Sequence, residues 1–184
     1  MQVVFLYGPP AVGKLTIAQE LQGRLGYKLI HNHLLINLLD QIFDFHNPSR
    51  RVLTREFRMR LVEEAIKNDI NLIITSGSAG SPTLFEYYKE LIKLIKENGG
   101  KLSMIHLTAD PKTLLSRIDD DFRKKYGKNF GKTELQDILS QKHFVFDKYP
   151  DLDHLTIDTS IVSAVEAAGK IIDHYHLREV SSAK

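Results

Sequence analysis

The fold of this chain is decided at its start, where an apolar segment runs into a glycine-containing loop: Gln2-Val3-Val4-Phe5-Leu6-Tyr7-Gly8-Pro9-Pro10-Ala11-Val12-Gly13-Lys14. The short apolar run ends at the Gly-Pro-Pro turn, which predicts a buried strand followed by a loop. After the loop, apolar residues recur at helical spacing: Ile17, Ala18, Leu21 and Leu25. Gly26 stands where such a helix would end. The segment therefore predicts a strand, a loop and a helix in succession.

The loop from Gly8 to Lys14 matches the phosphate-binding pattern G-x-x-x-x-G-K, and it lies between a predicted strand and a predicted helix, as that pattern requires. In such loops the backbone N–H groups point inward, and the helix N-terminus adds partial positive charge. Lys14 would add a full charge beside the terminal phosphates. The alternative is a glycine-containing turn with a solvent-exposed lysine. We expect a nucleotide to be held by these residues: Gly8, Pro9, Pro10, Ala11, Val12, Gly13, Lys14, Leu15 and Thr16.

The pattern departs from its full form at Leu15, where a serine or threonine hydroxyl normally ligates Mg²⁺. Leucine cannot coordinate a metal, and helical geometry turns Thr16 about 100° away from Leu15. The third predicted strand is followed by Ser76-Gly77, without the aspartate that often holds the metal in such sites. We therefore expect no dedicated metal-binding residue, and Mg²⁺ to depend on water and other groups.

Short apolar runs alternate with helical patterns along the rest of the chain. The further strands are predicted at 27–30, 70–75, 102–108 and 155–158. Helices are predicted at 31–43, 52–67, 82 to about 97, 112–118 and 161–175, and one more follows the charged stretch 119–132 and ends at about residue 146. Five short apolar strands alternating with helices predict a parallel sheet covered on both faces. In such sheets ligands bind beyond the carboxyl ends of the strands.

The composition excludes several classes of protein. The chain has 25 lysines and arginines against 23 acidic residues, a net charge of +2, which is too balanced for a protein that mainly neutralises nucleic acid. The absence of cysteine excludes disulfides, thiolate catalysis and cysteine-ligated zinc. No apolar run approaches the roughly 20 residues that span a bilayer. We expect one domain over residues 1–184, located in the cytoplasm and without a membrane partner.

On the strength of residues 8–16, the sequence resembles small P-loop kinases of the nucleoside and nucleotide monophosphate kinase group, in particular shikimate-kinase-like proteins and related AAA-type P-loop ATPases. The resemblance implies a three-layer α/β P-loop NTPase fold with a five-stranded parallel sheet in the order 2-3-1-4-5. It also implies an acceptor-binding helical region, here residues 31–68, and an arginine-bearing lid, here residues 117–132.

Arg117 and Arg123 match the lid of these kinases in type and approximate position. Closure of the lid would bring Arg123 to the transferring phosphoryl group, where an arginine stabilises the developing charge. The resemblance implies that Arg117 lies against the adenine, helped by the loop Asp158-Thr159-Ser160. The alternative is a solvated charged loop, which is what most charge runs are.

Three arginines share one face of the second helix predicted in the acceptor-binding region, at spacings of four and three residues: Arg51, Arg55 and Arg58. Like charges at these spacings repel, so an anionic ligand or an acidic neighbour is expected. In the similar kinases an arginine of this region binds the acceptor's carboxylate or phosphate, and Arg58 is the residue we assign to that role. Ordinary ion pairing is the alternative.

His31-Asn32-His33 follows the second predicted strand, where shikimate kinases carry acidic acceptor-binding residues. A histidine near its ordinary pKa can accept the acceptor's hydroxyl proton, and we assign this role to His33. Asp40 and Asp44 are alternatives. A histidine at a helix start also commonly makes only local hydrogen bonds.

The sequence thus predicts an ATP-dependent phosphotransferase that acts on a small hydroxyl-bearing molecule, with the catalytic residues Lys14, Arg117, Arg123 and His33. His33 and Arg58 would bind the acceptor. The cofactors would be ATP and Mg²⁺, the latter with a degenerate protein ligand at Leu15. The alternative is a non-catalytic or regulatory nucleotide-binding protein. Nucleic-acid binding through the lid lysines is a third interpretation, against which the net charge argues.

Overall fold

The computed structural model describes residues 1–44, 46–77, 82–118, 131–140 and 152–178. Its parallel sheet has the strand order β2-β3-β1-β4-β5, which confirms the order that the family resemblance implied. The strands are β1 (Gln2–Tyr7), β2 (Lys28–Ile30), β3 (Leu72–Ser76), β4 (Lys101–Thr108) and β5 (His154–Asp158). Tyr7 is in register with Ser76 on one side and with His106 on the other, so β1 and β3 end at the same edge of the sheet.

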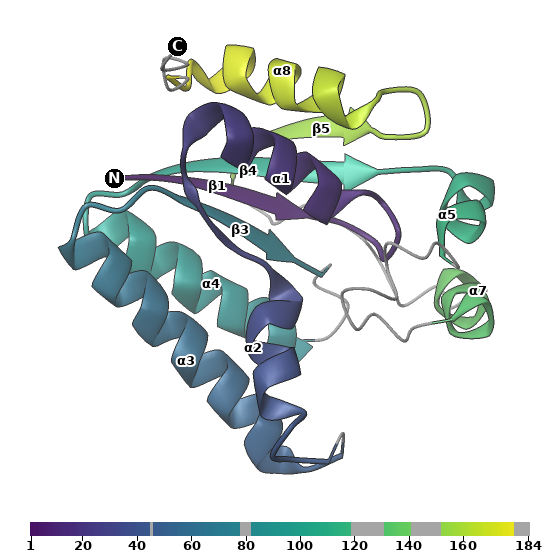
Figure 1. Ribbon diagram of the computed structural model, residues 1–184, viewed down its shortest axis with the longest axis horizontal. Helices are drawn as coiled ribbons and strands as arrows, with labels where there is room; N and C mark the ends of the chain where they lie inside the picture. Colours follow the sequence, from purple (N-terminus) through teal and green to yellow (C-terminus); the bar gives the residue numbers. More distant parts are fainter. Residues whose placement is uncertain (45, 78–81, 119–130, 141–151, 179–184) are drawn as a thin grey trace.

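Helices cover both faces of this sheet, as the alternating pattern predicts. They are α1 (Lys14–Leu25), α2 (Asn32–Leu39), α3 (Pro48–Lys67), α4 (Pro82–Glu97), α5 (Pro111–Arg117), α7 (Lys132–Ser140) and α8 (Ala164–Tyr175). Figure 1 shows α1 and α8 on one face and α3 and α4 on the other. In the same view, α5 and α7 lie beyond the carboxyl ends of the strands, at the edge where a ligand is expected.

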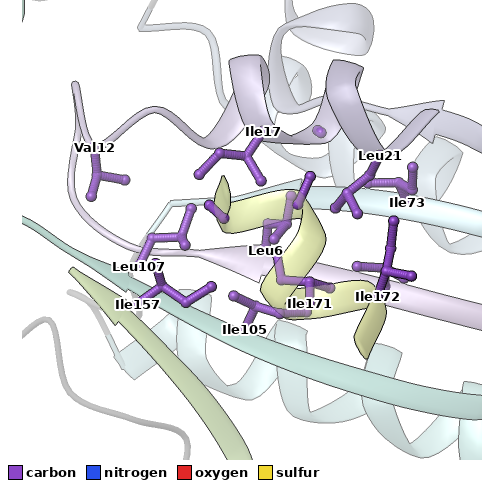
Figure 2. Packing of buried hydrophobic residues seen from close by; sticks show 14 of the residues in the cluster. Leu6, Val12, Ile17, Leu21, Ile73, Ile105, Leu107, Ile157, Ile171 and Ile172 are labelled. Atoms are coloured by element: carbon purple, nitrogen blue, oxygen red, sulfur yellow. The ribbon is translucent and has the colours of Figure 1, made fainter. Parts of the chain in front are cut away.

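Two buried clusters hold the layers together, one on each face. Alternate residues of β1 point to opposite faces because the side-chain period of a strand is two. Leu6 therefore joins the cluster under α1 and α8, which includes Ile17, Leu21 and Ile171 (Figure 2). Phe5 and Tyr7 join the cluster under α3 and α4. Because both clusters contain β1, the strand that leads into the phosphate-binding loop lies in the centre of the core.

The ends of the helices in the acceptor region differ from the sequence prediction. α2 ends at Leu39 rather than residue 43, and α3 begins at Pro48, four residues before the predicted start. The Asn47 side chain accepts a hydrogen bond from the Ser49 N–H at 2.9 Å, and Pro48 occupies the first turn. Both are helix-start signals, so the second helix begins within residues 44–51, which lie between the two predicted helices.

The last helix also begins later than predicted. α8 starts at Ala164, with a capping box in which Ser163 and Glu166 satisfy each other's backbone N–H groups. Ile161 is 82% exposed and lies before the helix, so the predicted start at residue 161 is wrong, and Val165 in the first turn is 55% exposed. Ile171 and Ile172, further along the helix, are buried. Most of the predicted lid, and the predicted helix beyond Ser140, lie outside the described residues.

Candidate nucleotide-binding site

The loop between β1 and α1 contains three residues with the positive φ angles that anion-binding nests use. Gly8, Ala11 and Gly13 have positive φ angles of 151°, 64° and 93°. The Val12 N–H donates to the Pro9 carbonyl at 3.4 Å, which closes a turn inside the loop. Alternation between left-handed and ordinary conformations points successive N–H groups toward one centre, where they bind anions.

The N-terminus of α1 adds to this loop. Gly13 is the N-cap of α1, and no side chain caps the helix there. Lys14, the first helical residue, folds back over the loop, and its Nζ donates to the carbonyl oxygens of Gly8 at 2.8 Å and Pro9 at 2.6 Å. A polyphosphate in the loop would exchange these two bonds for bonds to phosphate oxygens, next to the positive end of the helix dipole.

The residues next to the loop do not fit a dedicated Mg²⁺ site. Leu15 is 4% exposed and offers no ligand atom, and the Thr16 side chain is exposed. At the end of β3, the Ser76 hydroxyl donates to the Gly77 carbonyl at 2.6 Å. Within the described ranges, no cluster of three histidine or acidic side chains could hold a metal ion. Leu15 thus leaves the usual hydroxyl ligand absent at the start of α1.

Arg117 lies beside the loop, although more than a hundred residues separate the two in sequence. It is the last residue of α5, and its Nη1 and Nη2 donate to the Thr159 hydroxyl at 3.1 Å and the Thr159 carbonyl at 2.8 Å. Thr159 follows β5, and its hydroxyl lies 2.9 Å from the Val12 carbonyl of the loop. The structure thus brings Arg117 to the flank of the phosphate-binding loop, whereas Arg123 lies outside the described residues.

The start of α5 is fixed to the segment after β5 by a second set of bonds. The Asp110 N–H donates to the Ser160 hydroxyl at 2.8 Å, and the Asp110 carboxylate accepts from the hydroxyl and the N–H of Thr113. Hydrogen bonds donated to the carboxylate, that of the Thr113 hydroxyl being the largest cause, lower the pKa of Asp110 to about 2. Both ends of α5 are therefore attached to the loop that carries Thr159.

The three arginines that the sequence placed on one face of this helix have different surroundings in α3. Arg51 is exposed, and Arg55 forms an ion pair with Glu90 of α4. Arg58 is 2% exposed, and its Nη1 donates to the Tyr88 hydroxyl at 3.3 Å. Burial raises the pKa of the neighbouring Tyr87 to about 12, so this phenol stays neutral. The acidic neighbour that the sequence predicts is Glu90, which pairs with Arg55. Of the three arginines, Arg58 is the one that is buried.

His33 lies in the first turn of α2, a helix that packs against both α3 and β3. Of the two alternative bases, Asp40 forms an ion pair with Arg50. The hydrogen bond from Arg50, together with the charges of Arg50 and His33, lowers the pKa of Asp40 and makes it a weaker base. Asp44 is exposed beyond the end of α2.

Two long-range contacts of this region have no signal in the sequence. One is the bond between Thr159 and Val12, and the other joins Tyr7, which precedes the loop, to His154 at the start of β5, with Tyr7 Oη 2.8 Å from His154 Nδ1. Each contact joins residues 147 positions apart, so neither spacing nor periodicity could reveal it. The motif alone identifies the loop but not the residues that flank it.

A glycine-lined loop at the carboxyl edge of a 2-3-1-4-5 sheet, with a lysine folded over it, defines this chain as a P-loop protein. It belongs to the family described as "AAA domain", whose model matches residues 4–130. Among the described residues, no helix is both long and apolar enough to cross a membrane.

Known proteins share this fold. A putative kinase from Chloroflexus aurantiacus is 17% identical, with a TM-score of 0.70 over 95% of this chain and 96% of that one. Shikimate kinase from Acinetobacter baumannii, solved with shikimate, is 18% identical, with a TM-score of 0.61 over 95% and 92%. A nucleotide-binding protein of Chromohalobacter salexigens is 25% identical over 176 residues. That match covers 94% of this chain and 52% of the relative, so the chain spans about half of the relative's length.

Proposed function

We propose that this chain is an ATP-dependent phosphotransferase that acts on a small hydroxyl-bearing molecule. The observation that carries the proposal is the phosphate-binding loop, with Lys14 over its carbonyl groups and Arg117 at its flank. The solved kinases with the same fold support it. Residues 1–184 would act as one domain, in which residues 31–68 bind the acceptor and residues 117–132 form the lid.

In the proposed reaction the acceptor's hydroxyl oxygen attacks the γ-phosphorus of ATP. The bond from that phosphorus to the β,γ-bridging oxygen breaks, ADP leaves, and the hydroxyl proton passes to His33. Lys14 and the loop N–H groups hold the phosphates, while Arg117 and Arg123 stabilise the charge that develops on them. Arg58 binds an anionic group of the acceptor, because a buried guanidinium is suited to a planar carboxylate or a phosphate.

A second candidate function, nucleotide binding without phosphoryl transfer, is favoured by one observation. Leu15 occupies the position of the metal-binding hydroxyl, and among the described residues no cluster of three histidine or acidic side chains could hold a metal ion instead. Phosphoryl transfer depends mainly on positioning and electrostatic stabilisation, so the lysine and arginines would have to supply more of the stabilising charge here.

The test is ATP binding by calorimetry, followed by ADP release with a panel of hydroxyl-bearing acceptors that also carry a carboxylate or a phosphate. We expect acceptor-dependent ADP release that falls about 100-fold or more in Lys14→Met, a loss typical of a charge aimed at the transition state. Lys28→Met, which changes an exposed lysine on β2, serves as the matched control. ATP binding without turnover for any acceptor supports the second candidate, and absence of ATP binding rejects both.

A further inference from the structure

Thr159 connects three segments that surround the proposed nucleotide site. The residue is 4% exposed, and its hydroxyl oxygen lies within hydrogen-bond distance of Val12 O (2.9 Å), Thr108 O (3.2 Å) and Arg117 Nη1 (3.1 Å). Its backbone N–H donates to Thr108 O at 2.8 Å, and its carbonyl accepts from Arg117 Nη2 at 2.8 Å. One residue therefore contacts the phosphate-binding loop, the end of β4 and the end of α5.

The chemistry of a hydroxyl group fixes the direction of these bonds. A threonine hydroxyl has one hydrogen to donate and lone pairs to accept with, whereas a guanidinium can only donate. Arg117 is therefore the donor to Thr159, and the Thr159 hydrogen goes to a carbonyl. Val12 O is the nearer carbonyl, and Thr108 O already accepts the Thr159 N–H. The bonds then run from Arg117 through Thr159 to Val12, and each strengthens the next.

The same bonds fix the plane of the Arg117 guanidinium. Two of its N–H groups donate to two acceptors of one residue, the hydroxyl and the carbonyl of Thr159. Two hydrogen bonds to one residue fix the orientation of the planar guanidinium, whereas a single hydrogen bond would leave it free to rotate. Among the ion pairs of the described residues, none involves Arg117.

We propose that Thr159 is a positioning residue that couples Arg117 to the phosphate-binding loop, so that the arginine and the loop bind a nucleotide as one unit. The inference rests on the proposed nucleotide binding and goes beyond it, because it assigns a role to a residue outside the loop and outside the lid. It requires that the Thr159 hydroxyl acts on the nucleotide through Arg117.

A double-mutant cycle on ATP affinity tests this requirement. Thr159→Val keeps the shape of the side chain and removes the hydroxyl, and we expect it to weaken ATP binding about fivefold. Arg117→Met removes the donor, and we expect a loss of about tenfold or more. If Thr159 acts through Arg117, the double variant binds ATP as Arg117→Met does, within about twofold. Thr159→Ser retains the hydroxyl and restores affinity to within about twofold of the original protein.

Thr108→Val is the matched control, because it removes a neighbouring threonine hydroxyl whose bond, 3.4 Å to Ile157 O, does not involve Arg117. We expect it to leave ATP affinity unchanged. Arg117→Lys gives a second measurement that does not depend on the folding of Thr159→Val. Lysine keeps the charge but cannot bond to both Thr159 acceptors in the forked geometry, so the loss of affinity should persist.

Several results would overturn the coupling. They are additive losses in the double variant, full affinity in Thr159→Val, a Thr159→Ser protein as weak as Thr159→Val, or full affinity in Arg117→Lys. In each of these cases the original protein still binds ATP, so the proposed function survives. If the original protein binds no ATP, the proposed function is wrong, and the coupling through Thr159 is then wrong as well.

Discussion

The Leu107 carbonyl oxygen occupies the space into which a side chain at Gly8 would project. A Cβ atom at Gly8 would lie 2.2 Å from that oxygen, whereas real Cβ contacts are essentially never closer than 3.0 Å. Gly8 also has a positive φ angle of 151°, in a region that other residues rarely adopt. The first glycine of the loop is therefore required by the close approach of β4 as well as by the backbone conformation.

Gly8→Ala should damage both the fold and the site, since either the loop or β4 must move. We expect the free energy of unfolding to fall by about 2 kcal/mol, as for an overpacked core, and ATP affinity to fall with it. Urea denaturation and calorimetry measure the two effects. Gly23→Ala is the control, because Gly23 lies inside α1 with open space around it. It should stabilise the protein by about 0.5–1 kcal/mol. A Gly8→Ala protein as stable as the original would contradict the steric argument.

Leu15→Ser should make nucleotide binding respond to Mg²⁺. The serine restores the hydroxyl that P-loops normally use as a metal ligand, so we expect the ratio of ATP affinities with and without Mg²⁺ to rise by about tenfold. The change also removes a buried leucine side chain, which costs about 2–4 kcal/mol. Leu15→Ala is the matched control, because it leaves a similar cavity without a hydroxyl. An equal Mg²⁺ response in the two variants would show that the hydroxyl is not the cause.

Arg58→Met should weaken acceptor binding and leave ATP affinity nearly unchanged. Methionine fills a similar space next to Tyr88 but carries no charge, so we expect the KM for an anionic acceptor to rise about tenfold or more. Steady-state kinetics with the acceptor found in the panel measure this effect. Arg60→Met, on the same helix, serves as the control, because Arg60 is exposed and pairs only with Glu63 and Glu64 in the described ranges. An unchanged KM together with lower stability would indicate a purely structural role for Arg58.

Asp110 should make stability depend on pH in acid. Hydrogen bonds from Thr113 and Ser160 lower its pKa from 3.8 to about 2. A carboxyl group whose pKa is lower in the folded state stabilises the protein fully above its unfolded pKa, and this contribution disappears as the pH falls through the folded value. We therefore expect stability to decline between about pH 4 and pH 2, and Asp110→Asn to make this decline shallower.

Urea denaturation over this pH range tests the prediction. Asp173→Asn is the control, because it changes an exposed carboxylate on α8, far from the α5 cap in sequence. The assignment to Asp110 is wrong if both variants show the same pH profile as the original protein.

The sequence was most informative where the determining interactions are local. The strand and helix on either side of the phosphate-binding loop follow from an apolar run and helical spacing, and α5 lies within one residue of the helix predicted at 112–118. Prediction was poorer at the ends of α2 and α3, where Asn47 and Pro48 begin a helix in a segment that composition alone marks as a loop. The last helix was predicted to start at residue 161 and starts at Ala164, because helical spacing cannot show where a helix begins.

The sequence by itself determined the phosphate-binding loop, because its glycines, its lysine and the helix that follows act within a few residues of one another. The resemblance to P-loop kinases placed Arg117 and the loop Asp158-Thr159-Ser160 at the nucleotide, but only the tertiary structure decided how they contact the phosphate-binding loop. Parallel strands bring Val12, Thr108 and Thr159 to one edge of the sheet from distant parts of the chain, and Arg117 reaches the same point from α5. Hydrogen bonds of this kind depend on distances of about 3 Å, and separation along the chain carries no information about them.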